Sequence, residues 1–391
     1  MRLILFILSP FLTFLYSCFD LQRRSSQVVF VLFFALFGYC HTFEDVRADS
    51  HRKYLAFRSY SQSRNVGDVV DAFRDGDTKD IFEGVLFSVV RKFTDSPHVM
   101  MMLVGAIGGY FYMLVMRRFC RDRRMRYTLP IVILLLFMLL ESNIPLMGGI
   151  RNFVAFPLFL YSMIRVVIDG NRWWLIGLII TPLIHFSYVV LVALTLVVWI
   201  FRISNTVLHY VAVMACVASI FLDTSSYSGA MNLVIGMVDN EAIAYRVENY
   251  GAEDTDAHFN RSLTTRLVRL NNQLGAVFIA LLLIFVRHNR RTLHHSDYYE
   301  WRIYHALLFF VAVSFLMISF SVVGQRFVYV AMVLLYLYLL NLYQLNPQST
   351  LRRFIIALPL VYILHIAWSL YNCYCNVDMG ILYLPLPFLL L

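Results

Sequence analysis

The chain has 391 residues, of which 60% are hydrophobic and 16% aromatic. A soluble protein of this length would be nearer ~45–50% apolar, so the composition excludes an ordinary soluble enzyme and predicts an all-α, polytopic membrane protein. The formal net charge of +9 does not indicate nucleic-acid binding, because membrane proteins concentrate basic residues in their cytoplasmic loops.

Apolar runs of membrane-spanning length recur along the whole chain and predict a single membrane domain, 1–391, of about 11–12 transmembrane helices. The first run is expected to be an uncleaved span. A signal peptide is the alternative, but Tyr16 is too bulky for its cleavage site. The expected spans are 3–19, 28–41, 98–116, 128–147, 150–168, 173–201, 206–222, 273–286, 303–322, 327–345 and 354–371.

The loops predict the orientation of these spans. The segment RRFCRDRRMR, which begins at Arg117, holds six arginines against one aspartate, and the positive-inside rule assigns such a loop to the cytoplasm. The two long loops, 42–97 and 223–272, are then expected on the outside, together with the turn at 147–151.

The first long loop, 42–97, contains charged and amphipathic segments. Asp49 and Tyr54 lie in the mixed-charge stretch DSHRKY, which is either a functional surface or simply a solvated one. Further on, DIFEGVLFSVV predicts an amphipathic helix in the membrane interface, where Glu83 faces either a sugar or water. The apolar residues at helical spacing are Ile81, Val85, Leu86 and Val89.

Two arginines are each expected to begin a helix at the outer surface. Arg151 follows the glycine pair of MGGI, and Arg326 follows SVVGQ. Ionisable residues in membrane segments are costly and are candidates for function, although a snorkelling arginine is the alternative for each. A guanidinium binds phosphate through bidentate hydrogen bonds, and a helix N-terminus adds N–H donors. The pair therefore predicts a site for a lipid-linked diphosphate.

The apolar run at 173–203 is too long for one span. Its 31 residues would extend ~46 Å as a helix, against a ~30 Å hydrocarbon core. We expect a broken or re-entrant segment near Pro182–His185, with a single tilted and kinked span as the alternative. His185, beside the break, is either a general base for a hydroxyl or a neutral histidine bonded to a neighbouring helix.

The second long loop, 223–272, combines charged residues with tyrosines, which suits carbohydrate, although a plain surface loop would look similar. Its candidate sugar-binding residues are Arg246, Arg261 and Arg266. Cysteine and histidine spacing indicates no metal site. The repeat Gly105–Gly109 predicts a close contact between helices.

The motifs GGIRNFVAFPLFLYS, PLIHFSYVVLVAL and VGQRFVYVAM resemble, in that order, those of the EpsG/Wzy-like family of polysaccharide polymerases. Members of that family show an arginine that begins a helix after a turn, then a histidine followed closely by serine, and a later arginine that begins another helix. Here the histidine and serine are His185 and Ser187. Asn152 is a departure, because many relatives have glutamine after the first arginine.

The resemblance implies an enzyme of the bacterial cytoplasmic membrane with an outward-facing active site. It would join polysaccharide repeat units, as in O-antigen, capsule or exopolysaccharide, that are carried on undecaprenyl diphosphate, without metal, cofactor or nucleotide sugar. Arg151 and Arg326 would stabilise the leaving diphosphate, and His185, or alternatively Asp49, would orient or deprotonate the acceptor hydroxyl. Membrane lipids, and a flippase and chain-length regulator of the same pathway, are the expected partners.

Two alternatives remain open at this stage. An O-antigen ligase would share the lipid-linked donor but transfer the glycan to a lipid A core. A flippase or transporter for the same lipid-linked sugar usually shows two related halves, and the sequence contains no such internal repeat.

Overall fold

The computed structural model describes residues 2–44, 49–78, 80–120, 128–141, 147–201, 203–221, 263–289, 298–318, 321–345, 347 and 349–390. The chain divides into two compact units. The first unit comprises Met1–Trp199 and Trp368–Leu391, and the second comprises Ile200–Ala367. Every residue predicted for function in the first half of the chain lies in the first unit.

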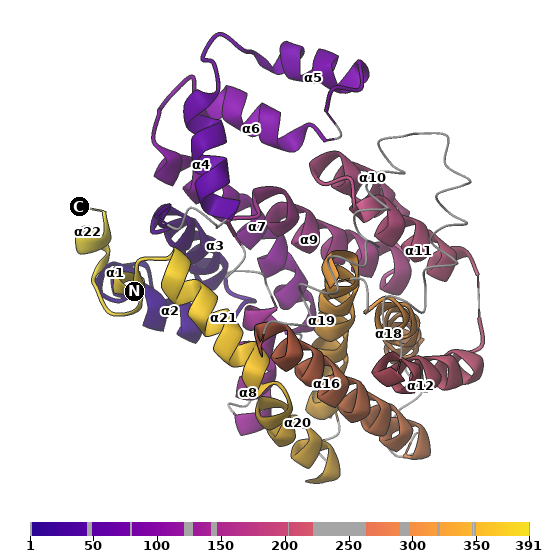
Figure 1. Cartoon of the computed structure of the whole chain (residues 1–391). Coiled ribbons are helices and arrows are strands. Elements are labelled where there is room, and N and C mark those ends of the chain that lie inside the picture. Colours follow the sequence, from indigo (N-terminus) through magenta and orange to yellow (C-terminus); the bar gives the residue numbers. More distant parts are fainter. Residues whose placement is uncertain are drawn as a thin grey trace. The chain divides into compact units, whose positions relative to one another are not determined.

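The described residues are almost entirely helical (Figure 1), and their one isolated β-bridge joins His41 and Val377. Four described helices are long and apolar enough to cross a membrane, or five if the bent pair Ser349–Val361 and Ile363–Asn376 counts as one. Shorter apolar helices follow other predicted runs. The structure therefore confirms an all-α polytopic membrane protein. The four long spans are Pro97–Arg118, Ile150–Ile168, Arg269–His288 and Phe327–Leu345.

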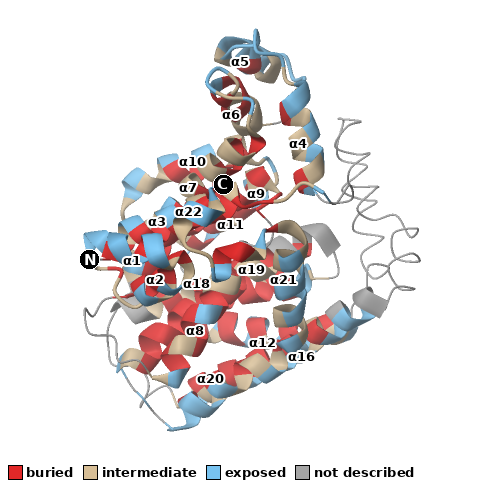
Figure 2. Ribbon diagram, turned by 90° about the vertical axis from the view of Figure 1, so that its left-hand side faces the viewer, coloured by how far each residue is buried: buried red, intermediate tan, exposed pale blue. Residues whose placement is uncertain are grey.

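The first unit is built around three closely packed helices, α3 (Arg24–Tyr39), α7 (Pro97–Phe119) and α9 (Ile150–Met163), the last of which is buried along most of its length (Figure 2). A side chain at Gly105 or at Gly38 would overlap the backbone of the other helix in the α3–α7 pair. The predicted close contact at Gly105–Gly109 is thus confirmed, with α3 as the partner. The remaining helices of the unit are α1 (Arg2–Leu8), α2 (Pro10–Cys18), α4 (Asp49–Ser59), α5 (Val66–Arg74), α6 (Phe82–Val90), α8 (Leu129–Leu140), α10 (Leu175–Ile184), α11 (Tyr188–Ile200) and α22 (Leu386–Leu389).

The N-terminal segment folds back on itself instead of crossing as one helix. Arg2 pairs with Asp20 at 2.7 Å, and its guanidinium lies 4.9 Å from the centre of the Tyr16 ring. A continuous helix would hold the two ends ~27 Å apart. The predicted single span over 3–19 is therefore wrong. Pro10, which has no N–H to continue the helix, begins α2 directly after the break at Ser9.

The first long loop folds into helices α4, α5 and α6, which group together at one end of the first unit (Figure 1). The predicted amphipathic helix is α6, but its buried face differs from the predicted one. Val89 is 42% exposed, whereas Phe87 and Val90 are each 2% exposed. The reason is α4, because the Phe87 ring packs edge-on against that of Phe57, with centroids 5.4 Å apart.

The second unit is a helical bundle in which α12 packs against α18 and α16, α18 against α19, and α16 against α20. Aromatic rings fill several of these contacts, as between Phe285 and Phe354, whose centroids are 5.1 Å apart. The helix α21 (Ile363–Asn376) runs from the second unit into the first. The other helices are α12 (Asn205–Phe221), α16 (Leu263–His288), α18 (Tyr298–Leu316), α19 (Ser321–Leu345) and α20 (Ser349–Val361).

Candidate functional site

Arg151 occupies the first turn of α9, as its sequence predicts. The helix begins at Ile150, directly after the glycine pair. A Cβ on Gly148 would lie 3.0 Å from the backbone nitrogen of Ser50, which shows how closely the start of α4 approaches this turn. The small residues of MGGI thus allow α4 to dock beside the N-terminus of α9.

Arg151 is part of a cluster of four charged side chains, which we call the Arg151 cluster: Lys53, Asp80, Glu83 and Arg151. The Arg151 Nη1 donates to Asp80 Oδ2 at 2.8 Å, and its Nε lies 3.3 Å from Glu83 Oε2. Lys53 Nζ donates to both oxygens of Glu83, at 2.7 and 2.6 Å. Two cations thus balance two carboxylates, and Arg151 remains 37% exposed while Asp80 is 7% exposed.

The carboxylates reach Arg151 because α6 begins between them. Glu83 lies in the first turn of α6 and Asp80 just before that helix, where the helix dipole favours negative charge. The backbone N–H of Ile81 donates to the Leu183 carbonyl at 3.0 Å. That carbonyl is available because α10 ends at Ile184, and the last carbonyls of a helix have no partner within it.

The predicted break near Pro182–His185 is confirmed. His185 is extended, at φ −150° and ψ 108°, and α11 begins at Tyr188. The ring centres of His185 and Tyr188 are 5.9 Å apart, and the Tyr188 hydroxyl donates to Asn152 Oδ1 at 2.9 Å. The break therefore does two things: it anchors the segment that carries Asp80, and it links His185 to the residue after Arg151. Asn152, which departs from the family pattern, accepts that hydrogen bond.

Burial raises the pKa of Asp80 above its ordinary value, since removal from water favours the neutral acid; Arg151 opposes the shift, and Glu83 adds to it. Protonated Asp80 cannot hold Arg151 as an ion pair. A pKa raised on folding also means that the native state holds this proton more tightly than the unfolded chain. The stabilising contribution of that proton is present below the unfolded pKa and is lost as the pH rises through the folded pKa.

A pH profile tests the role of Asp80. As the pH is lowered, we expect activity to fall because Asp80 takes up a proton and releases Arg151. Since the pKa of Asp80 is raised, this fall should occur at a higher pH than the titration of an ordinary aspartate. The Asp80→Asn protein should lack this acid limb and show reduced activity over the whole range. The measurement is the activity of both proteins against pH, and an identical acid limb in Asp80→Asn would contradict the assignment.

The other predicted residues are placed as follows. Asp49 is exposed on α4 and pairs with Arg52. Tyr54, next to Lys53, stacks on Phe43 with ring centres 5.3 Å apart. Two residues lie in the second unit, Arg266 in α16 and Arg326 in α19. The helix predicted around Arg326 is present, but it begins at Ser321, so the prediction that Arg326 begins it is wrong. Arg246 and Arg261 lie outside the described residues.

The structure joins Arg151 and Glu83 directly, and it adds Asp80 and Lys53, whose roles the sequence does not predict. Asp80 and Glu83 are three residues apart at the start of an apolar helix, a spacing that places two carboxylates on neighbouring positions. That spacing is the signal from which the pair could have been found. Among the described residues, no group of histidines, cysteines and carboxylates could hold a metal ion.

Comparison with known families gives one match. The model of the EpsG family matches residues 25–383, nearly the whole chain. Comparisons with curated proteins and with solved structures found no match. The matched range contains the Arg151 cluster, the break at His185 and the helix that begins before Arg326.

Proposed function

The chain belongs to the EpsG family, whose members have a polysaccharide-polymerase type of function, and on that basis we propose that it joins oligosaccharide repeat units carried on polyprenyl diphosphate at the outer face of the bacterial cytoplasmic membrane. The observation that supports this most is the Arg151 cluster: an arginine held by two carboxylates at a helix N-terminus.

The proposed donor site uses the exposed edge of Arg151. Its Nη1 and Nε face Asp80 and Glu83, so the carboxylates fix the plane of the guanidinium and leave Nη2 for a phosphate oxygen. Lys53 neutralises Glu83 and supplies a second positive charge nearby. Charge that develops on the diphosphate as it leaves is stabilised by such fixed donors.

The proposed reaction is a glycosyl transfer. The oxygen of the acceptor hydroxyl forms the new bond to the anomeric carbon of the donor, and the bond between that carbon and the diphosphate oxygen breaks. The hydroxyl proton passes to His185, which is linked through Tyr188 to Asn152, the residue after Arg151. Arg326, in α19 of the second unit, is proposed as a further phosphate-binding arginine on the strength of the resemblance to the family.

The function is tested in a strain that lacks the gene, by complementation. The wild-type chain should restore the ladder of surface polysaccharide, whereas Arg151→Ala, His185→Ala and Arg326→Ala should leave a single attached unit at normal membrane abundance. The control is Arg52→Ala, an exposed arginine on α4, which should restore the full ladder. A null strain without any attached polysaccharide would indicate a ligase, and full ladders from the arginine variants would refute the proposed donor site.

Lys53 provides a second test. In Lys53→Met, Glu83 loses one of its two cations and binds Arg151 more strongly, so it competes better with the diphosphate. We expect the KM for the lipid-linked donor to rise about fivefold, the effect of roughly 1 kcal/mol, with little change in kcat. Steady-state kinetics of the purified protein measures this. The matched control is Arg52→Met on the neighbouring position of α4, and an equal KM in both variants would exclude a role for Lys53.

A further inference from the structure

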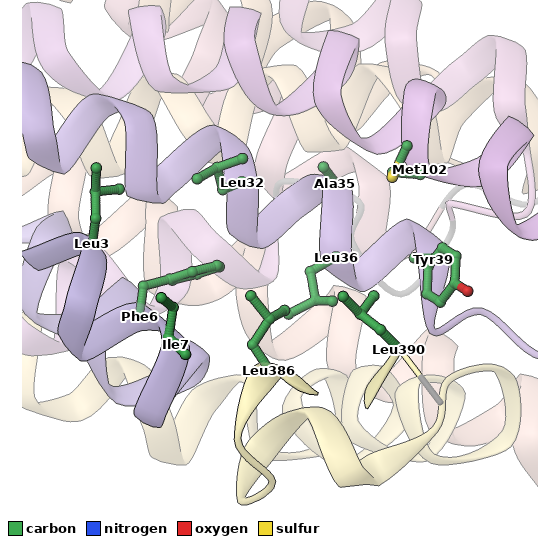
Figure 3. A pocket seen from close by; sticks show the side chains of 10 residues that line it. All are labelled: Leu3, Phe6, Ile7, Leu32, Ala35, Leu36, Tyr39, Met102, Leu386 and Leu390. Atoms are coloured by element: carbon green, nitrogen blue, oxygen red, sulfur yellow. The ribbon is translucent and has the colours of Figure 1, made fainter. Parts of the chain in front are cut away.

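An apolar groove of about 350 Å³ lies on the first unit between short elements and the long helices (Figure 3). The α1–α3 groove, as we call it, is lined by Phe6 of α1, Ala35 and Leu36 of α3, Met102 of α7 and Leu386 of α22. Its volume is at the lower end of the range of small-molecule sites, ~300–1,000 Å³. It therefore fits a short length of hydrocarbon chain rather than a whole lipid.

Two of the elements that border the groove are short. The α1–α2 hairpin returns to its own start, where Arg2 pairs with Asp20, and α22 is a four-residue helix near the C-terminus. Both elements lay apolar side chains along α3, and Leu3 and Leu390 remain 48% and 51% exposed. The exposed side chains leave the groove open along one side.

From one end of the groove a row of aromatic rings runs to α4, the helix that carries Lys53 of the Arg151 cluster. Tyr39, which lines the groove, has its ring centre 5.7 Å from that of His98, and its carbonyl oxygen lies 2.8 Å from His98 Nδ1. The His98 ring is 5.2 Å from Phe43, and Phe43 is 5.3 Å from Tyr54. Tyr54 directly follows Lys53, a member of the cluster, in the sequence of α4, and the Arg58 guanidinium lies 5.7 Å from the centre of its ring.

The row of aromatic rings beside the groove indicates what kind of ligand the groove could bind. Its occupant would have a hydrocarbon part in the groove and an anionic part at Lys53 and Arg151, joined by a chain that lies across aromatic rings. A polyprenyl diphosphate has this form, since it carries its negative charge at one end of a long branched hydrocarbon. Its branched hydrocarbon also suits contact with ring faces and with the flexible side chain of Met102.

We propose that the α1–α3 groove binds the polyprenyl chain of the lipid-linked substrate, with its diphosphate end directed along Tyr39, His98, Phe43 and Tyr54 toward the Arg151 cluster. This inference rests on the proposed function. It adds a binding site for the lipid part of the substrate, and it assigns Tyr39 and His98 to the path between that part and the reacting end.

A photo-crosslinking experiment tests the proposal without requiring activity. The full-length protein carries a photoreactive amino acid at Leu36, in the groove, or at Val28, which is 46% exposed on the same helix outside it. It is placed in phospholipid vesicles that contain a small fraction of labelled polyprenyl phosphate. At position 36, we expect the polyprenyl lipid to make up a several times larger fraction of the crosslinked lipid than of the bilayer. At position 28, the two fractions should be equal. Proportional capture at both positions would mean that ordinary acyl chains fill the groove and would overturn the proposal.

A variant that fills the groove provides the second arm. In Ala35→Trp the indole occupies the groove that Ala35 lines, so capture at position 36 should fall and the KM for the polyprenyl donor should rise about tenfold, the loss expected from withdrawing roughly two buried methylene groups. Val28→Trp is the matched control and should change neither. If the wild-type protein elongates glycan but shows no enriched capture, the groove assignment fails alone; if it does not elongate glycan at all, the proposed function fails.

Discussion

We expect the Arg151→Lys protein to reach the membrane in normal amount and to elongate glycan at less than about a hundredth of the wild-type rate, the loss typical of removing one fixed donor to a developing charge. The ammonium keeps the positive charge beside Asp80 and Glu83. It is a point charge, however, and cannot bind both carboxylates through separate nitrogens while it presents a third to phosphate. Single-turnover rates with a lipid-linked donor measure the effect.

A neutral replacement of Arg151 is complemented by a second variant that also removes a carboxylate charge. Arg151→Gln alone leaves the buried Asp80 without its nearest cation, so lower stability would contribute to any loss of activity in that variant. The double variant Arg151→Gln with Asp80→Asn removes both charges and should fold like the wild type. If this double variant elongates glycan normally, Arg151 has no part in the reaction.

The largest effect on stability is expected for Gly105→Val. The new side chain would overlap the Phe34 carbonyl oxygen of α3, and Gly38 makes the reciprocal close contact with the Met101 carbonyl of α7. Backbone atoms cannot move aside as a flexible side chain can, so α3 and α7 must separate. We expect a loss of about 3 kcal/mol or more, measured as a lower temperature of aggregation in detergent.

The control for Gly105→Val is Tyr110→Leu, which changes a residue of α7 that is 48% exposed. It should leave the stability close to that of the wild type. Equal stability of Gly105→Val and Tyr110→Leu would show that α3 and α7 are not packed as closely as the structure has them.

Local features of the site could be predicted where one or two residues restrict the backbone around them. Pro182 and the excess length of 173–203 predict a break, and α10 ends at Ile184. The glycine pair predicts a turn before Arg151, and α9 begins there. In both cases the cause acts within a few residues: a missing N–H, or a backbone without a Cβ.

The partners of Arg151 were harder to predict because they are distant in sequence. Asp80 is 71 residues from Arg151, and a single aspartate in a long loop has no periodicity that would connect it to α9. The fold-back at Ser9 was missed for another reason. Hydropathy over 3–19 is uniform, and only Pro10 and the distant pairing of Arg2 with Asp20 separate a hairpin from a crossing helix.

The equal numbers of positive and negative groups around Arg151 have a consequence for turnover. A bare pair of cations would retain any free phosphate or spent lipid diphosphate that reached it, and the enzyme would stall on its own product. Here Asp80 and Glu83 compete for Arg151 and Lys53 whenever the substrate is absent. In the proposed reaction the carboxylates would thus help to expel the spent carrier lipid and return the site to a state that is ready for the next repeat unit.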